Sequence, residues 1–387
     1  MQQLNESTES NTINNQTEQI KFTGKAGEYF AIWIVNVALT ILTLGIYSAW
    51  AKVRTNQYFY GNTFLADASF RYTANPVQIL KGRLIAFAVF MAYSISTSMD
   101  PVIAGGALIL LMILTPAFLV MSMAFRLRNS MYRNVRFNFD KNFKRAYFIY
   151  ALPVIVIGLY VFITSQIQNF VAEDPEAMTT LGMMMAVLVI AILIMFPWWD
   201  FMVTKFKVAH AKFGTSDFKF SATLKNYYTM YFIAFVLAIL VFGLAGFIMV
   251  GAMELLKTSG EEVGVLPIIM PFLVIFIMLP AYLWLFAYMQ AKRTNLMYNN
   301  MDISGNKVKS ELKTGYLLYL YVTNTLAMMV SLGLLMPWAK IRTARYRASV
   351  TSLNVAGDLG QYTSAQEQQQ SALGEEMGEM FDMDLGF

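Results

Sequence analysis

Long apolar runs separated by short polar connections form the hydrophobic pattern of this 387-residue chain. The runs cover residues 29–50, 84–99, 102–125, 146–168, 178–203, 227–253, 266–290 and 316–338. Because a helix rises about 1.5 Å per residue, about 20 apolar residues suffice to cross a hydrocarbon core roughly 30 Å thick. The pattern predicts a polytopic membrane protein in which the six central runs are spanning helices, paired into three hairpins.

The basic residues are confined to alternate connections. All of the 29 Lys and Arg residues except Lys21, Lys25 and Lys257 fall in segments 51–83, 126–145, 201–226, 291–314 and 339–348. The intervening connections are acidic and hold Asp100, Glu173, Asp174, Glu176, Glu254, Glu261 and Glu262. Cytoplasmic loops of membrane proteins are enriched in Lys and Arg, so we expect the basic connections and both tails in the cytoplasm.

The first and last runs resemble each other. Residues 25–58 and 313–346 align without a gap and match at eleven positions, which predicts an internal duplication. The last run is flanked by basic residues on both sides, so a single crossing would place cations on the wrong face of the membrane. We therefore expect both runs to be re-entrant pairs of half-helices or helices bent along the interface. One ordinary span with an imperfect charge rule is the alternative.

Aromatic residues alternate with other residues in the basic connections. Tyr132-x4-Phe137-x-Phe139 recurs as Phe213-x4-Phe218-x-Phe220, and Asn129-x-Met131-Tyr132-x-Asn134 recurs as Asn295-x-Met297-Tyr298-x-Asn300. Alternation predicts short strands with one buried face, with turns at Gly61-Asn62 or Gly214-Thr215. Such strands can assemble into one small cytoplasmic sheet or ring. The expected fold class is an all-α polytopic membrane protein with six spanning helices, two re-entrant segments and short β-strands in the cytoplasmic loops.

Composition narrows the class of protein. Hydrophobic residues make up 57% of the chain, charged residues make up 14%, and the mean hydropathy is +0.49, which is typical of an integral membrane protein. Cysteine is absent and His210 is the single histidine, so disulfides, thiol chemistry and Cys- or His-based metal sites are excluded. We expect neither an enzyme nor a cofactor. The basic loops suit anionic lipid headgroups or a membrane protein partner, and nucleic-acid binding is not expected.

The two ends of the chain are polar. Residues 1–19 are rich in Asn, Gln, Thr and Glu, and residues 358–387 are rich in Gln, Glu and Gly. Both compositions predict disordered tails, the second of them acidic. Residues 20–357 are then expected to form a single membrane domain.

A stretch near the N-terminus is similar to a known family. Its residues are Phe22, Thr23, Gly24, Tyr29, Phe30, Asn36, Leu42 to Tyr47, Trp50, Ala51, Arg54, Tyr58 and Asn62. They resemble the YjgN family of bacterial inner-membrane proteins, and the similarity extends over nearly the whole chain apart from the tails. The resemblance implies a bacterial inner-membrane protein, and it carries over no catalytic residue because the family has no established activity.

Polar residues inside the duplicated runs are candidate functional residues. Asn36 and Asn324 occupy equivalent positions, and an amide in hydrocarbon must face protein or water. One hypothesis is that they line a shared path together with Thr40, and that Gly45 and Gly333 let the backbones approach closely. The alternative is that each asparagine makes an interhelical hydrogen bond that holds the bundle together.

Charged residues next to the apolar runs form a second group. Trp50, Lys52 and Arg54 match Trp338, Lys340 and Arg342, and they are typical of interfacial anchors, with a substrate clamp as the alternative. Asp200 follows Pro197-Trp198-Trp199 and is near enough in sequence to pair with Lys205. It is a possible proton or cation site, or an ordinary carboxylate at a helix end.

The pattern favours two functions from different classes. Repeated discontinuous segments with paired polar residues are the way in which transporters build a central site, so we expect a channel or transporter for a small solute. The near absence of intramembrane charge favours a neutral solute. The alternative is a non-catalytic scaffold or regulatory subunit that binds a partner protein or anionic lipid through its basic loops.

Overall fold

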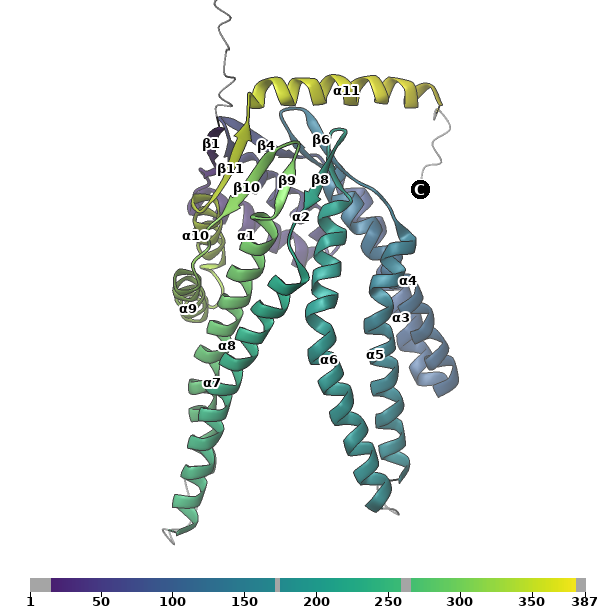
Figure 1. Cartoon of the computed structure of the whole chain (residues 1–387), viewed down its shortest axis with the longest axis vertical. Coiled ribbons are helices and arrows are strands. Elements are labelled where there is room, and N and C mark those ends of the chain that lie inside the picture. Colours follow the sequence, from purple (N-terminus) through teal and green to yellow (C-terminus); the bar gives the residue numbers. More distant parts are fainter. Residues whose placement is uncertain (1–14, 171–174, 259–265, 381–387) are drawn as a thin grey trace, which may run out of the picture.

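The computed structural model describes residues 15–170, 175–258 and 266–380. Residues 1–14 and 381–387 of the predicted tails lie outside these ranges, as do the predicted external acids Glu173, Asp174, Glu261 and Glu262. The strands gather at one end of the molecule, and pairs of long helices run away from that end and diverge (Figure 1). The molecule therefore has a β-rich end and a helical end.

Helices alternate with short β-hairpins along the chain. The helices are α1 (Ala26–Leu42), α2 (Ser48–Gly61), α3 (Pro76–Met99), α4 (Pro101–Arg128), α5 (Phe143–Phe170), α6 (Pro175–Ala209), α7 (Leu224–Thr258), α8 (Leu266–Tyr298), α9 (Thr314–Val330), α10 (Met336–Ser349) and α11 (Leu359–Met380). The strands are β1 (Asn15–Gln19), β2 (Lys21–Phe22), β3 (Thr63–Leu65), β4 (Ala68–Tyr72), β5 (Ser130–Tyr132), β6 (Val135–Phe139), β7 (Ala211–Phe213), β8 (Ser216–Phe220), β9 (Met301–Ile303), β10 (Asn306–Ser310) and β11 (Thr351–Ala356).

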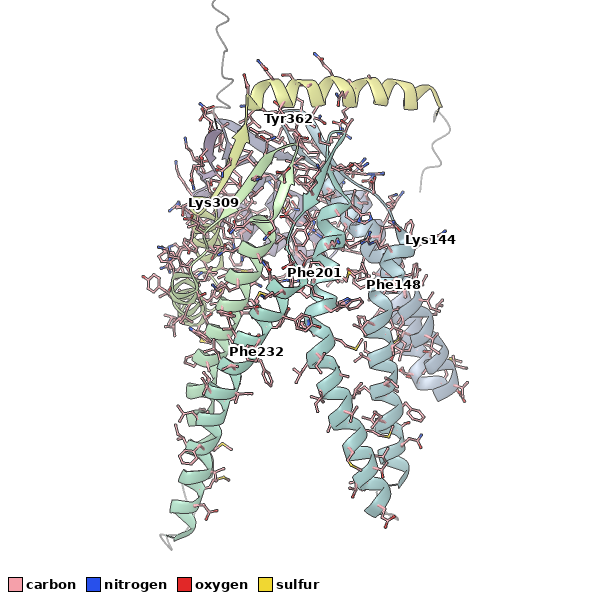
Figure 2. All side chains as sticks on the ribbon, in the orientation of Figure 1. Lys144, Phe148, Phe201, Phe232, Lys309 and Tyr362 are labelled. Carbon is pink, nitrogen blue, oxygen red and sulfur yellow. The ribbon has the colours of Figure 1, made fainter. Side chains whose placement is uncertain are left out.

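Within the described residues, five helices are long and apolar enough to cross a membrane, namely α3, α4, α5, α6 and α7. Their most apolar windows are 11–22% buried, so most of their side chains face outward. Phe232 on α7 is one example, whereas Lys144 and Lys309 lie toward the β-rich end (Figure 2). Exposed apolar side chains on helices whose backbones are satisfied internally are suited to lipid. The predicted total of six spans, which includes the 33-residue α8, remains a prediction.

The strands form one antiparallel sheet whose ends meet. Within the described residues it has eleven strands, in the order β1-β11-β10-β9-β8-β7-β6-β5-β4-β3-β2. β1 pairs with β11 and β2 pairs with β3, while Ile20 alone separates β1 from β2. The N–H of Ile20 donates to the carbonyl of Thr351 at 3.1 Å. The sheet is therefore a closed ring, here called the β-ring, and closure protects strand edges that would otherwise be unpaired. The all-α class is thus too simple, because the loop strands join into one sheet.

One hydrogen bond recurs around the β-ring. The residue after β2, β4, β6, β8 or β10 donates its N–H to the carbonyl of the residue before β3, β5, β7, β9 or β11, respectively. These bonds run from Thr23 to Asn62 (3.0 Å), Thr73 to Asn129 (2.9 Å), Asp140 to His210 (2.8 Å), Ser221 to Asn300 (3.0 Å) and Glu311 to Val350 (2.9 Å). The described chain thus contains five equivalent connections around one ring. They also show that Asn129 corresponds to Asn300, so the alignment of Asn129 with Asn295 was wrong.

The hairpin turns explain how such short strands reverse. Ala66-Asp67, Arg133-Asn134 and Ser304-Gly305 have positive φ at both central residues, and Gly214 has a φ of 60°. Turns with positive φ match the twist of the two strands that they join. Gly214-Thr215 is a turn as predicted, but Gly61 is the last residue of α2 and supplies no hairpin turn.

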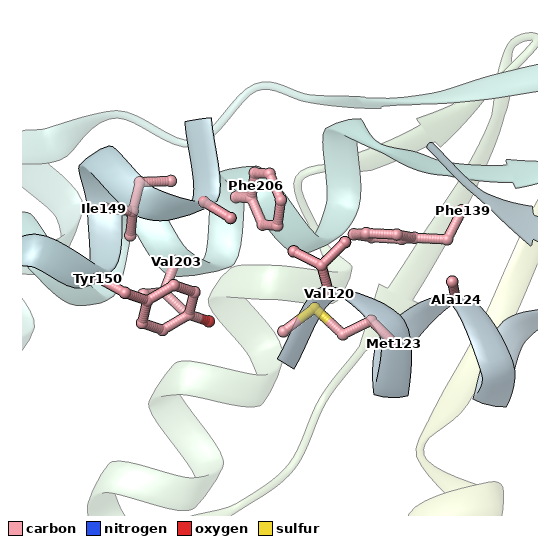
Figure 3. Close-up of a cluster of buried hydrophobic side chains, with 9 residues drawn as sticks. Val120, Met123, Ala124, Phe139, Ile149, Tyr150, Val203 and Phe206 are labelled. Carbon is pink, nitrogen blue, oxygen red and sulfur yellow. The ribbon is translucent and has the colours of Figure 1, made fainter. Parts of the chain in front are cut away.

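Helices α1 to α10 pack in the same circular order as the strands. Each contacts its neighbours in sequence, and α10 contacts α1. Where α4, α5 and α6 meet the β-ring, Val120, Phe139, Ile149 and Phe206 are at most 2% exposed and form a shared core (Figure 3). Burial at this end joins helices to strands, whereas the far ends of the long hairpins diverge (Figure 1).

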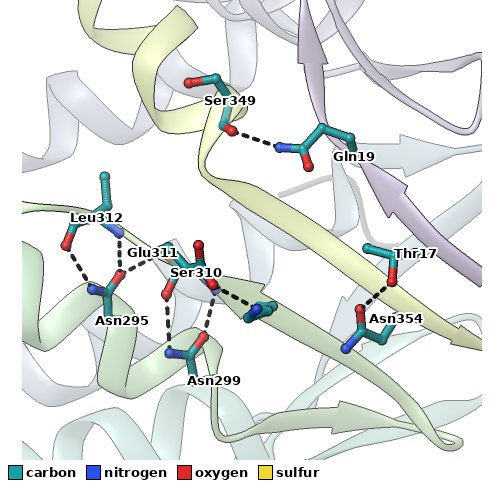
Figure 4. A network of polar contacts seen from close by, with 10 residues as sticks. Thr17, Gln19, Asn295, Asn299, Ser310, Glu311, Leu312, Ser349 and Asn354 are labelled. Carbon is teal, nitrogen blue, oxygen red and sulfur yellow. Dashed lines mark hydrogen bonds and ion pairs between the residues drawn. The ribbon is translucent and has the colours of Figure 1, made fainter.

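Polar contacts attach α8 to the chain around β10. Asn295 Nδ2 donates to Leu312 O at 2.9 Å, and Asn295 Oδ1 accepts from Leu312 N at 2.9 Å (Figure 4). Asn299 pairs with the backbone of Ser310 in the same way, at 3.1 and 2.6 Å. Each side-chain amide satisfies one backbone donor and one backbone acceptor. It therefore takes the place that a neighbouring strand would have at that point.

The two predicted re-entrant segments are short helical hairpins, α1–α2 and α9–α10. In the first, Leu44 N donates to Ile41 O and Gly45 N donates to Thr40 O, which is a Schellman motif. Leu332 and Gly333 make the corresponding bonds, and φ is 50° at both leucines and 93° and 88° at the glycines. The matched segments therefore have the same local conformation.

The orientation of these hairpins differs from that of the long helices. α9 is seen nearly end-on where α5, α6, α7 and α8 run along the long axis (Figure 1). This crosswise direction favours helices along the interface over half-helices that point into the membrane. Re-entry and duplication both remain predictions.

The predicted tails are partly ordered. Residues 15–19 form β1, and Leu359–Met380 form the helix α11, which lies across the β-rich end (Figure 1). Disorder was therefore wrong for these residues. The physical reason is that β1 supplies the strand that closes the β-ring, and α11 packs Leu359 and Tyr362 against that ring.

Candidate functional site

A cavity of about 580 Å³ lies inside the β-ring. Every strand from β2 to β11 contributes to its wall. The residues that line the cavity include Phe70, Tyr132, Phe137, Phe213, Ile303 and Leu353. Four aromatic residues of the alternating pattern line the inside of the ring, namely Tyr132, Phe137, Phe213 and Phe218. The other two, Phe139 and Phe220, pack against the helices. The volume is in the range of small-molecule sites, roughly 300–1,000 Å³.

Contacts between aromatic side chains fix the shape of this wall. The ring centroids of Phe70 and Tyr132 are 4.9 Å apart, and those of Phe137 and Phe213 are 5.0 Å apart. The hydroxyl of Tyr132 donates to Leu65 O at 2.7 Å, and burial raises the pKa of this tyrosine. Tyr132 is therefore neutral near pH 7, and the wall is apolar and uncharged where these residues meet.

Helix α11 covers one mouth of the cavity. Leu359, Tyr362 and Thr363 belong to the cavity wall, and Tyr362 lies between α11 and the sheet (Figure 2). Gln366 Oε1 accepts from Thr215 N at 2.8 Å, and Gln370 Oε1 accepts from Arg136 N at 2.9 Å. Amide side chains therefore tie the helix to the turn at Thr215 and to the start of β6 at Arg136.

A second cavity of about 560 Å³ lies between α2, α8, α9 and α10. It shares Phe59, Ala344 and Arg347 with the first cavity, so the two adjoin at these residues. Arg347 is exposed, and it is the charged residue common to the two walls. Arg347 therefore places a positive charge where the two cavities adjoin.

The two predicted path-lining asparagines have different surroundings. Asn324 is 6% exposed and lines the second cavity, where its Nδ2 donates to Thr343 Oγ1 at 3.2 Å and to Ala339 O at 3.4 Å. Asn36 is 3% exposed and lines neither of these cavities. Within the described residues, its Nδ2 and Oδ1 have no hydrogen-bond partner. The structure therefore does not bring both asparagines to one shared path.

The other predicted path-lining residues lie at or near the connection between the two helices of each hairpin. Thr40 Oγ1 donates to Asn36 O at 2.6 Å, within its own helix. Nothing lies within 4 Å of the place where a Cβ would project from Gly45 or Gly333. Close approach of backbones at these glycines was wrong, and their positive φ explains why glycine occupies the position.

The predicted anchors make contacts within the protein. Arg342 lies over the rings of Trp338 and Tyr319, with its guanidinium carbon 5.1 and 4.8 Å from the ring centres. Its Nη1 donates to Thr323 Oγ1 at 2.6 Å. This arrangement holds the guanidinium on the protein by cation–π contacts and a hydrogen bond, and gives it less freedom than an anchor in lipid headgroups has.

The matching residues of the first hairpin are arranged differently. The rings of Trp50 and Tyr47 stack at 6.1 Å, and Arg54 Nη1 donates to Tyr47 Oη at 3.0 Å. Lys52 is exposed, whereas Lys340 lies 6.0 Å from the ring centre of Tyr29 and lines the second cavity.

Asp200 is buried, with a relative exposure of 1%, and forms an ion pair with Arg293. Its Oδ2 accepts from Tyr231 Oη at 3.0 Å. Lys205 instead lies over the ring of Phe201 at 5.8 Å, so pairing between Lys205 and Asp200 was wrong. Five residues along a helix correspond to about 500°, which puts the two side chains on different faces.

Sequence reasoning missed the residues that define the cavities. The alternating aromatic pattern was the signal for the β-ring wall, but it does not tell a cavity from a filled core. No signal marked Arg347, Arg293 or Tyr362. Among the residues that the structure describes, no group of three or more His, Asp or Glu side chains could hold a metal ion.

Comparison with known proteins gives the family. A model described as "Bacterial protein of unknown function (DUF898)" matches residues 17–380. The chain belongs to the DUF898 family. It is 26% identical over 371 residues to the "Inner membrane protein YjgN" of Salmonella typhimurium (strain LT2), which covers 89% of this chain and 90% of that protein.

Further relatives of this DUF898 chain carry the same name. "Inner membrane protein YjgN" of Escherichia coli (strain K12) is 28% identical over 152 residues, or 38% of each chain. The resemblance to the YjgN family is thus confirmed, and the five apolar helices fit an inner-membrane protein. No solved structure matches the chain.

Proposed function

We propose that this protein is a non-enzymatic inner-membrane carrier that takes a small molecule with an apolar body into the β-ring. The observation that carries the proposal is the cavity of about 580 Å³ whose wall is built from every strand from β2 to β11. A closed ring of strands under a circle of helices encloses a common axis, and the adjoining second cavity extends this space between helices. The apolar wall favours an apolar solute over an ion.

The proposal includes a membrane placement. The β-ring lies on the cytoplasmic side with both tails, because its connections hold the basic residues. The hairpin tips insert into the cytoplasmic leaflet. Leu44 and Leu332 are 95% and 94% exposed at a backbone conformation for which glycine is the usual residue. Leucine at such a position is costly in water and favourable in lipid.

A cavity-filling substitution tests the carrier. Ala211 lines the β-ring cavity and is 8% exposed, whereas Ala209 is exposed two residues earlier. Ala211→Leu should slow the transfer of an uncharged fluorescent long-chain alcohol between water and proteoliposomes, and Ala209→Leu is the matched control. Transfer at the rate of protein-free vesicles, or equal transfer by both variants and the wild-type protein, contradicts the proposal.

The scaffold alternative is favoured by one observation. The most apolar windows of the five apolar helices are 11–22% buried, which leaves a large surface for lipid or a partner protein. A scaffold should be insensitive to Ala211→Leu. It should instead lose binding to phosphatidylglycerol vesicles when Arg133, Arg136 and Arg145 are changed to Glu, and the carrier should keep its solute transfer in that variant.

A further inference from the structure

Cations from several helices gather where the helices enter the β-ring. Arg126 is near the end of α4, Lys207 near the end of α6, Arg293 on α8 and Arg347 near the end of α10. Lys207 lies within electrostatic range of Arg126, Arg293 and Asp200. These helices are equivalent in the circular arrangement, because α4, α6 and α8 each lead into a hairpin and α10 leads into β11.

The cations lie near the junction between the two cavities, and among the four only Arg347 lines either cavity. Tyr298 lines the β-ring cavity and lies within electrostatic range of both Arg126 and Arg347. Arg347 itself belongs to the walls of both cavities. Arg126 is thus close to both Lys207 and the junction, and the four cations form one group, here called the cation cluster.

The charges of the cation cluster are not balanced by the acid beside it. Asp200 is the carboxylate within range of Lys207, and it is already paired with Arg293. Four cations and one carboxylate leave an excess of positive charge, with Arg126, Arg293 and Arg347 exposed and Lys207 half-buried. Like charges repel each other and are stabilised by a bound anion. The cluster is therefore complementary to an anionic group.

The space next to the cluster is apolar and offers one free hydroxyl. The wall of the β-ring cavity is formed by aromatic and aliphatic side chains. The hydroxyl of Tyr362, at the α11 side, is buried without a hydrogen-bond partner among the described residues. A ligand that fills this cavity can offer apolar contact along its length and a polar atom at its far end.

We propose that the cation cluster binds the anionic group of a single-chain amphiphile whose apolar chain fills the β-ring cavity. This inference rests on the proposed carrier function and names its substrate class. Lys and Arg at a membrane interface also contact the headgroups of the surrounding bilayer, which requires neither a cavity nor chain length. Arg347 distinguishes the two, because it faces the cavities.

Binding to the purified full chain in an uncharged detergent tests this inference. The probes are a fluorescent long-chain carboxylate, a single-chain phosphate monoester and the matching alcohol. The two acids distinguish a free fatty acid from a lysophospholipid as the source of the anionic group. We expect the better acid to bind at least about tenfold more tightly than the alcohol, since charge-assisted hydrogen bonds are the stronger ones.

Three variants locate the binding. Arg347→Gln should weaken binding of the acid by about tenfold and leave the alcohol unchanged. Lys219→Gln removes a cation from an exposed position on β8 and should change neither. The cavity-filling Ala211→Leu should weaken acid and alcohol alike, with a larger effect on longer chains.

The outcomes separate this inference from the proposed function. Equal affinity for acid and alcohol, or equal effects of Arg347→Gln and Lys219→Gln, overturns the anionic substrate and leaves an apolar carrier in place. Binding of the acid that Ala211→Leu does not affect places the chain outside the β-ring, and it overturns both.

Discussion

Replacing Asn36 and Asn324 one at a time by leucine should change stability in opposite directions, although the two residues occupy equivalent positions. Asn324 donates to Thr343 and Ala339 and accepts from Arg342 Nη1 at 3.4 Å. Its loss leaves buried partners unsatisfied, which costs about 1–3 kcal/mol. Asn36 is buried with both amide atoms unpartnered among the described residues, so its replacement by leucine should stabilise by up to about 1–3 kcal/mol.

The assay is unfolding of the purified protein in mixed micelles by increasing dodecyl sulfate, followed by circular dichroism. Gln57→Leu, at an exposed position of α2, controls for a general effect of leucine on micelle binding. A loss of stability in Asn36→Leu equal to that in Asn324→Leu refutes the reasoning, because it means that the Asn36 amide has a partner, such as a bound water or ligand.

Three further predictions concern the hairpin tips and α11. Because the chain lacks cysteine, Leu44→Cys and Leu332→Cys can be labelled without background, and we expect an impermeant maleimide to reach neither in membranes and both in denaturant; labelling in intact inverted vesicles contradicts tip insertion. Gly45→Ala and Gly333→Ala should each destabilise by about 1–3 kcal/mol because φ is positive at both, and equal thermal stability to the wild type contradicts this. Truncation after Gly357 removes α11, which covers one mouth of the cavity, and it should leave the membrane helices intact while speeding entry of the fluorescent alcohol; slower or unchanged entry contradicts a barrier at this mouth.

Individual elements show how much of the structure could be predicted from the sequence. The alternating aromatics of residues 132–139 and 213–220 correctly indicated strands, because a period of two residues is a property of the local chain. The Asn129 pattern misled, since a short motif can recur in a helix and at a helix end. The different hydrogen bonding of Asn36 and Asn324 could not be predicted either. It depends on where neighbours such as Thr343 and Arg342 lie in space, and not on which residue types they are.

The sequence by itself determined the membrane class, the long helices, the similarity of residues 25–58 to residues 313–346, and the family, because length, hydropathy and similarity act along the chain. Only the tertiary structure decided that the short strands close into a ring, that β1 and α11 are ordered, and that a cavity lies inside the ring. Pairing of β1 with β11 joins residues more than 330 positions apart. Ring closure depends on how all five connections fit together in space, and no local pattern of residues contains that information.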